Sequence, residues 1–201
     1  MRIIFDARPL LEKHWSGVSV FTAELLDALA RRNANEYALF ANSLAVKPPQ
    51  LAHPAEWKFS RYPNKALNAA FAFLHAPKIE RLAGDADLVY LPNFNFIATN
   101  KPLIVTAHDL SFVHYPDFFS PRQRLWHALV APKRMAHRAD AIVAVSENTK
   151  NDLMETYKVS PERIRVVYPG VSPRFTVIPP ERIAEIKKSK LKGKSGSQIL
   201  R

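Results

Sequence analysis

Cysteine is absent from this sequence of 201 residues. Its absence excludes a disulfide framework, thiolate zinc ligands and a cysteine nucleophile, and it fits a reducing compartment. The chain lacks any apolar run near the ~20 residues that a membrane-spanning helix needs, and Asp6 comes too early for the apolar core of a signal peptide. The histidines show no H-E-x-x-H spacing, so we expect no metal site. We therefore expect a cytoplasmic protein, with peripheral contact at the inner face of a membrane as an alternative.

The positive charge of the chain is unevenly distributed. The formal net charge is +11, and residues 182–201 contribute +6 of it, because they hold seven Lys or Arg and one Glu. Outside this stretch the chain is only modestly basic. It shows no interleaved aromatics or recognisable nucleic-acid module, so we expect no specific nucleic-acid partner.

The hydrophobic pattern alternates strand-length apolar runs with helical periodicity, which is typical of an α/β fold. Several of the runs are continuous Val, Ile and Leu stretches, as in parallel strands that are buried on both faces. We predict a Rossmann-like, doubly wound and mostly parallel sheet with helices on both faces. The predicted strands are 2–5, 37–41, 57–60, 87–92, 102–107, 140–146 and 163–170, and the predicted helices are 17–32, 65–84, 121–138 and 147–157.

The predicted helix at 65–84 has two open interpretations. Pro77 should break or kink it. Its apolar stretch "ALNAAFAFL" either packs against the core or lies on a membrane surface. After residue 175 the pattern ends in a proline pair and a Lys, Gly and Ser-rich run, so we expect one domain at 1–175 and a basic linker or disordered tail at 176–201.

Polar residues follow the predicted strands repeatedly. Ligands of open parallel α/β sheets bind outside the carboxyl ends of the strands, so these residues outline a candidate site. They are Asp6, Asn93, His108, Asp109 and Ser146, together with Gly17 at the start of the first helix.

Each of these residues also has a structural alternative. Gly17 either lets a ligand phosphate or sugar approach the helix N-terminus, or begins a helix where a side chain would crowd the sheet. Ser146 is a helix N-cap in its alternative role, and Asn93 is a loop residue. His108 suits contact with a sugar hydroxyl near neutral pH, whereas His108 and Asp109 could instead satisfy turn amides.

Five segments taken in order resemble a known family. They are "IIFDARPLL", "SGVSVFTAELLDALA", "DLVYLPNF", "PLIVTAHDLSFVHYPDFFS" and "ADAIVAVSENTKNDLMETYKVSPERIRVVYPGVSPRF". Together they look like the N-terminal domain of the family-four, or group-one, glycosyltransferases of GT-B architecture. The resemblance implies two Rossmann-like domains facing each other across a cleft, the first binding a glycan or lipid-linked acceptor and the second a nucleotide-sugar donor. It also implies retention of anomeric configuration and no catalytic metal or cofactor.

The resemblance carries over to particular residues. Gly17, flanked by Ser16 and Val18, matches the family's loop near the donor phosphates, and His108 matches the histidine that contacts the transferred sugar. We therefore take His108 as the candidate catalytic residue, with Asp109 as either its partner or a turn former. The candidate substrate-binding residues are Ser16, Gly17, Val18, Asn93, Asp109 and Ser146.

The sequence departs from the family pattern in two ways. Ser19 stands where the loop usually has a second glycine, and only 26 residues follow "GVSPRF", where a donor domain should begin. We expect half of an enzyme, either truncated, with a tail read in a shifted frame, or completed by a separate chain. Such a half should be inactive alone. The alternative function is a non-catalytic remnant that binds a glycan or a partner protein.

Overall fold

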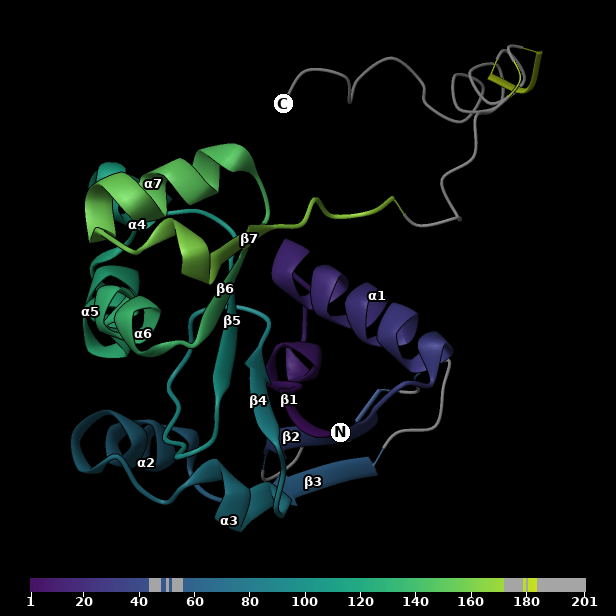
Figure 1. The fold of residues 1–201 in the computed structure, drawn as a ribbon, viewed down its shortest axis with the longest axis vertical. Coiled ribbons are helices and arrows are strands. Elements are labelled where there is room, and N and C mark those ends of the chain that lie inside the picture. The colour runs from purple at the N-terminus through teal and green to yellow at the C-terminus, as the bar shows by residue number, and fades with distance from the viewer. Residues whose placement is uncertain (44–47, 50, 52–55, 172–178, 180, 184–201) are drawn as a thin grey trace, which may run out of the picture. The chain divides into compact units, whose positions relative to one another are not determined.

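Seven parallel strands form the centre of the molecule in the order β3-β2-β1-β4-β5-β6-β7 (Figure 1). The computed structural model describes residues 1–43, 48–49, 51, 56–171, 179 and 181–183. The strands are β1 (Arg2–Asp6), β2 (Glu36–Asn42), β3 (Glu56–Ser60), β4 (Leu88–Leu91), β5 (Leu103–Ala107), β6 (Ala141–Ala144) and β7 (Ile164–Val166). The Rossmann-like, all-parallel sheet of the sequence prediction is thus confirmed.

The chain divides into two units, residues 1–169 and 170–201, and every strand belongs to the first. The predicted boundary at residue 175 lies outside the described residues, so it stays a prediction. No helix among the described residues is long and apolar enough to cross a membrane.

One face of the sheet is covered by α1 (Gly17–Arg32), which follows the short 3-10 turn η1 (Arg8–Leu11). Leu26 of α1 packs with Phe5 and Leu39, whose side chains leave the sheet on this side. Ser16 and Ser19 form a capping box at the start of the helix, and the left-handed residue Asn33 ends it. These local signals explain why the predicted helix 17–32 has the observed bounds.

Most of the remaining helices contribute side chains to the larger core on the opposite face. Alternation along the strands separates the two cores, so that Ile4 and Phe40 face this side while Phe5 and Leu39 face α1. The helices are α2 (Asn64–Ala69), the π-helical η2 (Ala70–Leu74), α3 (Ile79–Ala83), α4 (Ser111–His114), η3 (Pro116–Phe118), α5 (Pro121–Val130), α6 (Pro132–Arg138), α7 (Glu147–Tyr157) and η4 (Pro161–Arg163).

Two predicted helices are interrupted in the structure. The stretch 65–84 stops after η2 and resumes at α3, on either side of Pro77, as the proline indicated. The prediction of one helix at 121–138 was wrong. Ala131 has a left-handed backbone with φ 52° and separates α5 from α6, because Pro132 disfavours helical geometry in the residue before it.

The connection from β4 to β5, residues 92–102, contains neither helix nor strand. A crossover between parallel strands usually includes a helix that covers the sheet. Its absence leaves a hollow between η2 on one side and α5 and α6 on the other, lined by Phe71, Ile97 and Val130 among others.

Candidate active site

The direction in which successive strands are added to the sheet reverses between β1 and β4, which are neighbours at the centre of the sheet. From β1 the chain proceeds outward to β2 and β3, and from β4 it proceeds to the opposite edge. The crevice outside the carboxyl ends of these two strands is the usual ligand site of an open α/β sheet. Asp6 ends β1, and Asn93 follows β4 by two residues, so the structure places both at this edge.

The start of α1 lies in the connection that leaves β1. Ser16 accepts a hydrogen bond from the Ser19 amide at 3.4 Å, and Gly17 is the first helical residue. A Cβ added at Gly17 would meet no atom within 4 Å. The explanation that a side chain would crowd the sheet is therefore wrong, and the open space leaves the approach of a ligand as the functional alternative. The Val18 carbonyl accepts a hydrogen bond from Thr22 Oγ1 at 2.7 Å.

A carboxylate not foreseen from the sequence lies beside this helix start. Glu12 Oε2 accepts hydrogen bonds from Ser16 Oγ at 3.1 Å and from Ser19 Oγ at 2.7 Å. The N-terminus of a helix favours a negative charge, and here the chain supplies that charge itself. Ser19, which replaces the expected second glycine, is buried and helps to hold Glu12 in place.

His108 follows β5 and is held by contacts from two other elements. Its Nε2 lies 2.9 Å from the carbonyl oxygen of Pro92, and its ring meets the ring of Phe21 on α1 edge to face at 4.9 Å. Because a carbonyl only accepts, the contact assigns the proton to Nε2 and leaves Nδ1 of the neutral ring as an acceptor. Burial lowers the pKa of His108 below its ordinary 6.5, and the Pro92 hydrogen bond and the Asp109 charge offset this only in part.

Asp109 has the geometry of a turn residue. Its Oδ1 accepts from the Ser111 amide at 2.8 Å and from Ser111 Oγ at 2.5 Å, which fixes the entry into α4. Of the two alternatives from the sequence, turn former or partner of His108, this hydrogen bonding matches the first.

Ser146 caps α7 by accepting from the Thr149 amide at 3.1 Å. Thr149 Oγ1 in turn donates to the His108 carbonyl at 2.9 Å. The start of α7 therefore positions the backbone of His108, a connection between β5 and β6 that the sequence alone did not reveal.

Asn93 has a buried side-chain oxygen, Oδ1, with no hydrogen-bond partner among the described residues. It is adjacent to Pro92, whose carbonyl contacts His108. A buried acceptor without a partner costs about 1 to 3 kcal/mol. Asn93 Oδ1 is therefore free to accept a hydrogen bond from a ligand, unlike a loop side chain whose hydrogen bonds are all made within the protein.

A buried ion pair lies under the same edge of the sheet. Arg8 donates through Nε and Nη2 to the two carboxylate oxygens of Asp6 at 2.7 and 2.8 Å, and Nη2 also donates to the Phe96 carbonyl at 2.7 Å. Asn95 Nδ2 donates to Asp6 at 3.2 Å. The network ties β1 to the loop that carries Asn93. An Asp-x-Arg sequence directly after an apolar strand was the available signal for it.

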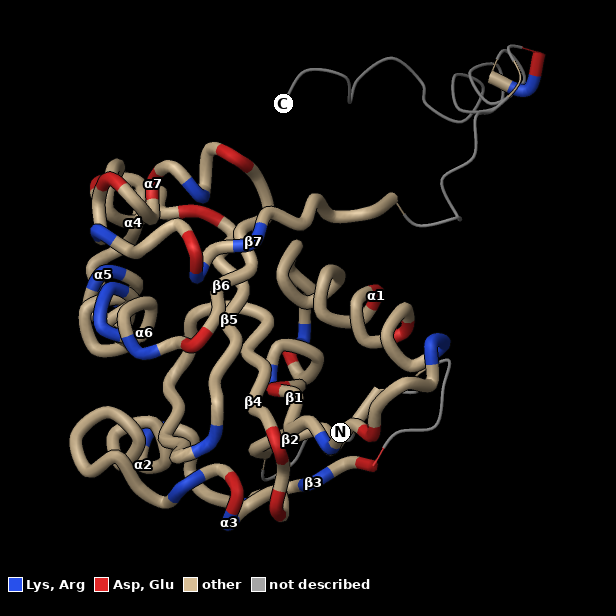
Figure 2. The backbone as a smooth tube through the Cα atoms, viewed as in Figure 1, with Lys and Arg blue, Asp and Glu red and all other residues tan. Residues whose placement is uncertain are grey.

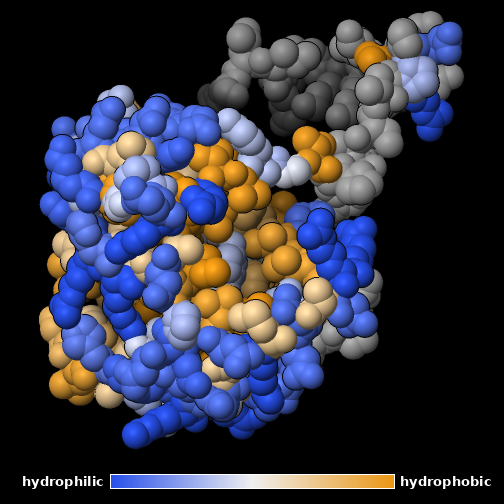
Figure 3. Space-filling model, in the orientation of Figure 1, coloured by the Kyte–Doolittle hydropathy of each residue, from blue (hydrophilic) through white to orange (hydrophobic). Residues whose placement is uncertain are grey.

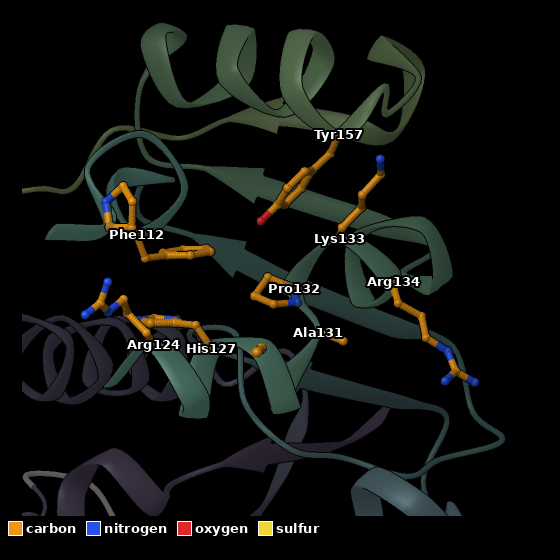
Figure 4. Close-up of a pocket in the computed structure, with 10 residues that line it drawn as sticks. Phe112, Arg124, His127, Ala131, Pro132, Lys133, Arg134 and Tyr157 are labelled. Atoms are coloured by element: carbon orange, nitrogen blue, oxygen red, sulfur yellow. The ribbon is translucent and has the colours of Figure 1, made fainter. Parts of the chain in front are cut away.

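A cavity of about 540 Å³ is lined by none of the predicted site residues. Figure 4 shows Tyr157 pointing from α7 into this space, close to the overlapping rings of Phe112 and His127. These two rings stack at 4.2 Å with an interplanar angle of 5°. Burial raises the pKa of Tyr157 to about 12 and lowers that of His127. The cavity lies between the crossovers that follow β5 and β6, so we interpret it as a packing gap rather than the site.

A metal centre has no support from the described part of the chain, where no three His, Asp or Glu side chains come close enough to hold an ion.

The sequence model of the family described as Glycosyltransferase Family 4 matches residues 15–175. The chain belongs to glycosyltransferase family 4. The match includes α1, His108 and α7, and hence every predicted site residue. No curated protein matches the chain.

Solved structures with the GT-B fold resemble this family-4 chain. HepE from Anabaena in complex with UDP-glucose has a TM-score of 0.56 at 19% identity, and the same protein with UDP and glucose has 0.57 at 20%. Each match covers 94% of this chain and 50% of that chain. Sucrose-phosphate synthase from Thermosynechococcus elongatus has a TM-score of 0.58 at 15% identity, with 92% and 52% covered. At these identities the likeness shows the fold, and this family-4 chain spans about half the length of those proteins.

Proposed function

We propose that this chain is the acceptor-side half of a glycosyltransferase that moves a sugar from a nucleotide-sugar donor to a glycan or lipid-linked acceptor. The reaction retains anomeric configuration and uses no metal or cofactor. The family match carries the proposal, because it spans the α1 N-terminus and His108, which meet at the reversal point of the sheet through Phe21. The donor sugars bound by HepE make UDP-sugars the first donors to test.

His108 acts as an acceptor in this proposal. With Nε2–H directed at the Pro92 carbonyl, Nδ1 receives a hydrogen bond from a hydroxyl of the transferred sugar. The lowered pKa keeps the ring neutral near pH 7, and this preserves the lone pair. Asn93 Oδ1 accepts a second sugar or acceptor hydroxyl, and the open space at Gly17 admits the donor phosphates.

The isolated chain is inactive in this proposal, and its donor half is a separate chain or a further part of the protein. A cleft transferase accelerates the reaction by enclosing donor and acceptor together and by excluding water. One wall of the cleft supplies neither the enclosure nor the contacts to the nucleotide.

The second candidate is a non-catalytic module that binds a glycan or a partner protein. The Glu12 carboxylate favours it, since it places a negative charge beside the start of α1, which a donor phosphate would approach. A negative group there weakens the binding of another anion.

The test is calorimetry of the purified chain with UDP-glucose, GDP-mannose and glucose, together with an assay for sugar release. We expect no turnover. Sugar binding that is lost in His108→Ala and in Asn93→Ala supports the acceptor half. His75→Ala, at the end of η2 and outside the candidate site, is the control and should keep sugar binding. Robust turnover by the pure chain would refute the claim that it is inactive alone.

Glu12→Gln separates the two candidates. If the carboxylate blocks a phosphate position, UDP affinity rises by about threefold or more when the charge is removed, as expected from a single charge at a helix N-terminus. Raised UDP affinity together with glycan binding that survives His108→Ala favours the binding module. Unchanged UDP affinity together with glycan binding that is lost in His108→Ala favours the acceptor half.

A further inference from the structure

Two large apolar side chains at the end of η2 face solvent. Phe73 is 69% exposed and Leu74 is 73% exposed, whereas Leu67 and Phe71 of the same stretch are buried in the core. Figure 3 shows the corresponding apolar group at the edge of the molecule, beyond α2. The core-packing interpretation of this segment is therefore correct for Leu67 and Phe71 but does not account for Phe73 and Leu74. One side packs on the sheet, and the C-terminal end remains available for another surface.

Two exposed leucines of α5 add to the apolar surface. Leu125 is 60% exposed and Leu129 is also exposed, and residues four apart lie on one side of a helix. Arg134 Nη2 lies 3.1 Å from His75 Nε2, so η2 and the α5–α6 pair are adjacent. Between them is the hollow left by the helix-free β4–β5 connection, a cavity of about 460 Å³ with Phe71 and Leu129 among its lining residues.

The rim of this cavity is cationic. Lys78, Arg134 and Arg138 line it, and no carboxylate does. The sequence stretches 61–79 and 118–139, which supply most of the surface, contain no Asp or Glu. Figure 2 shows Lys and Arg gathered on α5 and α6. Glu80, Asp117 and Asp140 border these two stretches. Glu80 accepts from the Asn100 amide at 2.7 Å, Asp140 accepts from the Leu103 amide at 2.8 Å, and Asp117 pairs with Arg124 at 3.7 Å.

We propose that this surface binds an anionic lipid bilayer. We call it the η2–α5 face and define it by Phe73, Leu74, Leu125 and Leu129 with Lys78, Arg134 and Arg138. The four apolar side chains enter the boundary between headgroups and acyl chains, and the cations contact lipid phosphates, with the cavity receiving a headgroup.

Charge complementarity selects this partner over others. Exposed leucines beside cations that no carboxylate among the cavity-lining residues neutralises suit a surface that is apolar below and negative above. Three of the four apolar side chains are aliphatic and give nucleic-acid bases no platform for stacking, which leaves Phe73 alone for that role. The proposal depends on these contacts and not on transferase activity, so it stands or fails separately from the proposed function.

The absence of cysteine allows a position-specific test. Leu74→Cys and Val20→Cys, each labelled with a polarity-sensitive fluorophore, report the two faces of the sheet, because Val20 is exposed on α1. The probes are vesicles of phosphatidylcholine alone and vesicles enriched in phosphatidylglycerol. We expect a blue shift at position 74 with the anionic vesicles only, and no shift at position 20.

Charge variants complete the test. Lys78→Glu and Arg134→Glu should each weaken vesicle binding by about fivefold or more, as expected for the loss of one cation near an anionic surface. Arg32→Glu, an exposed arginine on α1, is the matched control for nonspecific attraction.

Three results would overturn the proposal. The first is sedimentation with anionic vesicles without a shift at position 74, which would assign binding to the basic residues 182–201. The second is an equal loss of binding in Arg32→Glu. The third is a shift at position 74 caused by a single-stranded oligonucleotide and not by vesicles, which would assign the face to nucleic acid.

Discussion

Asp6 is the one charged residue among the buried polar side chains of the described structure, and it ends the central strand β1. Arg8 compensates it with two hydrogen bonds, and its guanidinium also lies 5.4 Å from the centre of the Phe40 ring. The pair is buried with satisfied geometry, so its main effect appears when one partner is removed.

Replacing the arginine alone should therefore be severe. Arg8→Met should lower the free energy of unfolding by about 3 to 5 kcal/mol, since it leaves a buried carboxylate unpaired. The double variant Asp6→Asn, Arg8→Met should recover much of the loss. Urea titration measures both, with Arg31→Ala as control. Arg31 pairs with Asp27 at the exposed surface of α1 and should cost below about 1 kcal/mol. A loss for Arg8→Met no larger than the control's contradicts a compensating role for Arg8.

His108 and His127 should make stability depend on pH. Burial lowers the pKa of both, so the unfolded chain binds more protons than the folded chain as pH falls below about 6.5. Their contribution to stability is complete above that value and decreases on acidification. The urea midpoint should be measured at pH 7.5 and pH 5.5, roughly one unit on either side of the ordinary histidine pKa. The difference between the two midpoints should be smaller in the double variant His108→Gln, His127→Gln than in the original chain. The exposed His14→Gln serves as control, and an equal difference in all three proteins would contradict the assignment.

The residues of the candidate site were predictable to the extent that they follow strands. His108, Asn93 and Ser146 each come directly after an apolar run, and parallel strands bring their carboxyl ends to one edge. The contacts that hold them were not predictable, because Phe21 meets His108 across 87 positions of sequence, and Glu12 reaches Ser19 through a loop without a regular pattern. Local propensity carries no information on such pairs.

Helix ends were predictable where side chains mark them. Ser16 and Ser146 fixed the starts of α1 and α7, whereas the end of α5 was missed because Ala131 carries no recognisable C-cap signal and only Pro132 indicates it. Three of these helices end in left-handed residues other than glycine, namely Asn33, Ala131 and Lys158. Such residues are strained relative to glycine unless a side chain offsets the cost.

Lys158, with φ 59°, offers a test at the end of α7. Lys158→Gly should raise the free energy of unfolding by about 0.5 to 1 kcal/mol, because glycine adopts this geometry without a Cβ clash. Lys150→Gly, within α7, should lower it by about 1 kcal/mol through lost helix propensity. Thermal and urea unfolding distinguish the two, and a loss at both positions would show that the Lys158 side chain offsets its backbone strain.

At the scale of the whole first unit, two cores share one sheet. The smaller core includes Leu26 of α1 and the larger includes Leu153 of α7, and both contain side chains of the central strands β1 and β2. A sheet that forms the wall of both cores should couple them, so that neither melts alone.

Leu26→Ala and Leu153→Ala should therefore each lower global stability by about 2 to 5 kcal/mol. The urea midpoint should fall while the slope of the transition stays constant, since the whole unit still unfolds in one step. Two separate transitions in circular dichroism and tryptophan fluorescence would contradict the coupling.

The position of β1 at the centre of the sheet also affects how the chain is made. Its partners are β2 on one side and β4 on the other, and β4 begins only at Leu88. At ordinary rates of synthesis, the ribosome needs roughly 4 to 16 s to add the residues between β1 and β4. Throughout that interval one edge of β1 lacks its neighbour in the sheet, which is the condition in which nascent chains aggregate and chaperones bind.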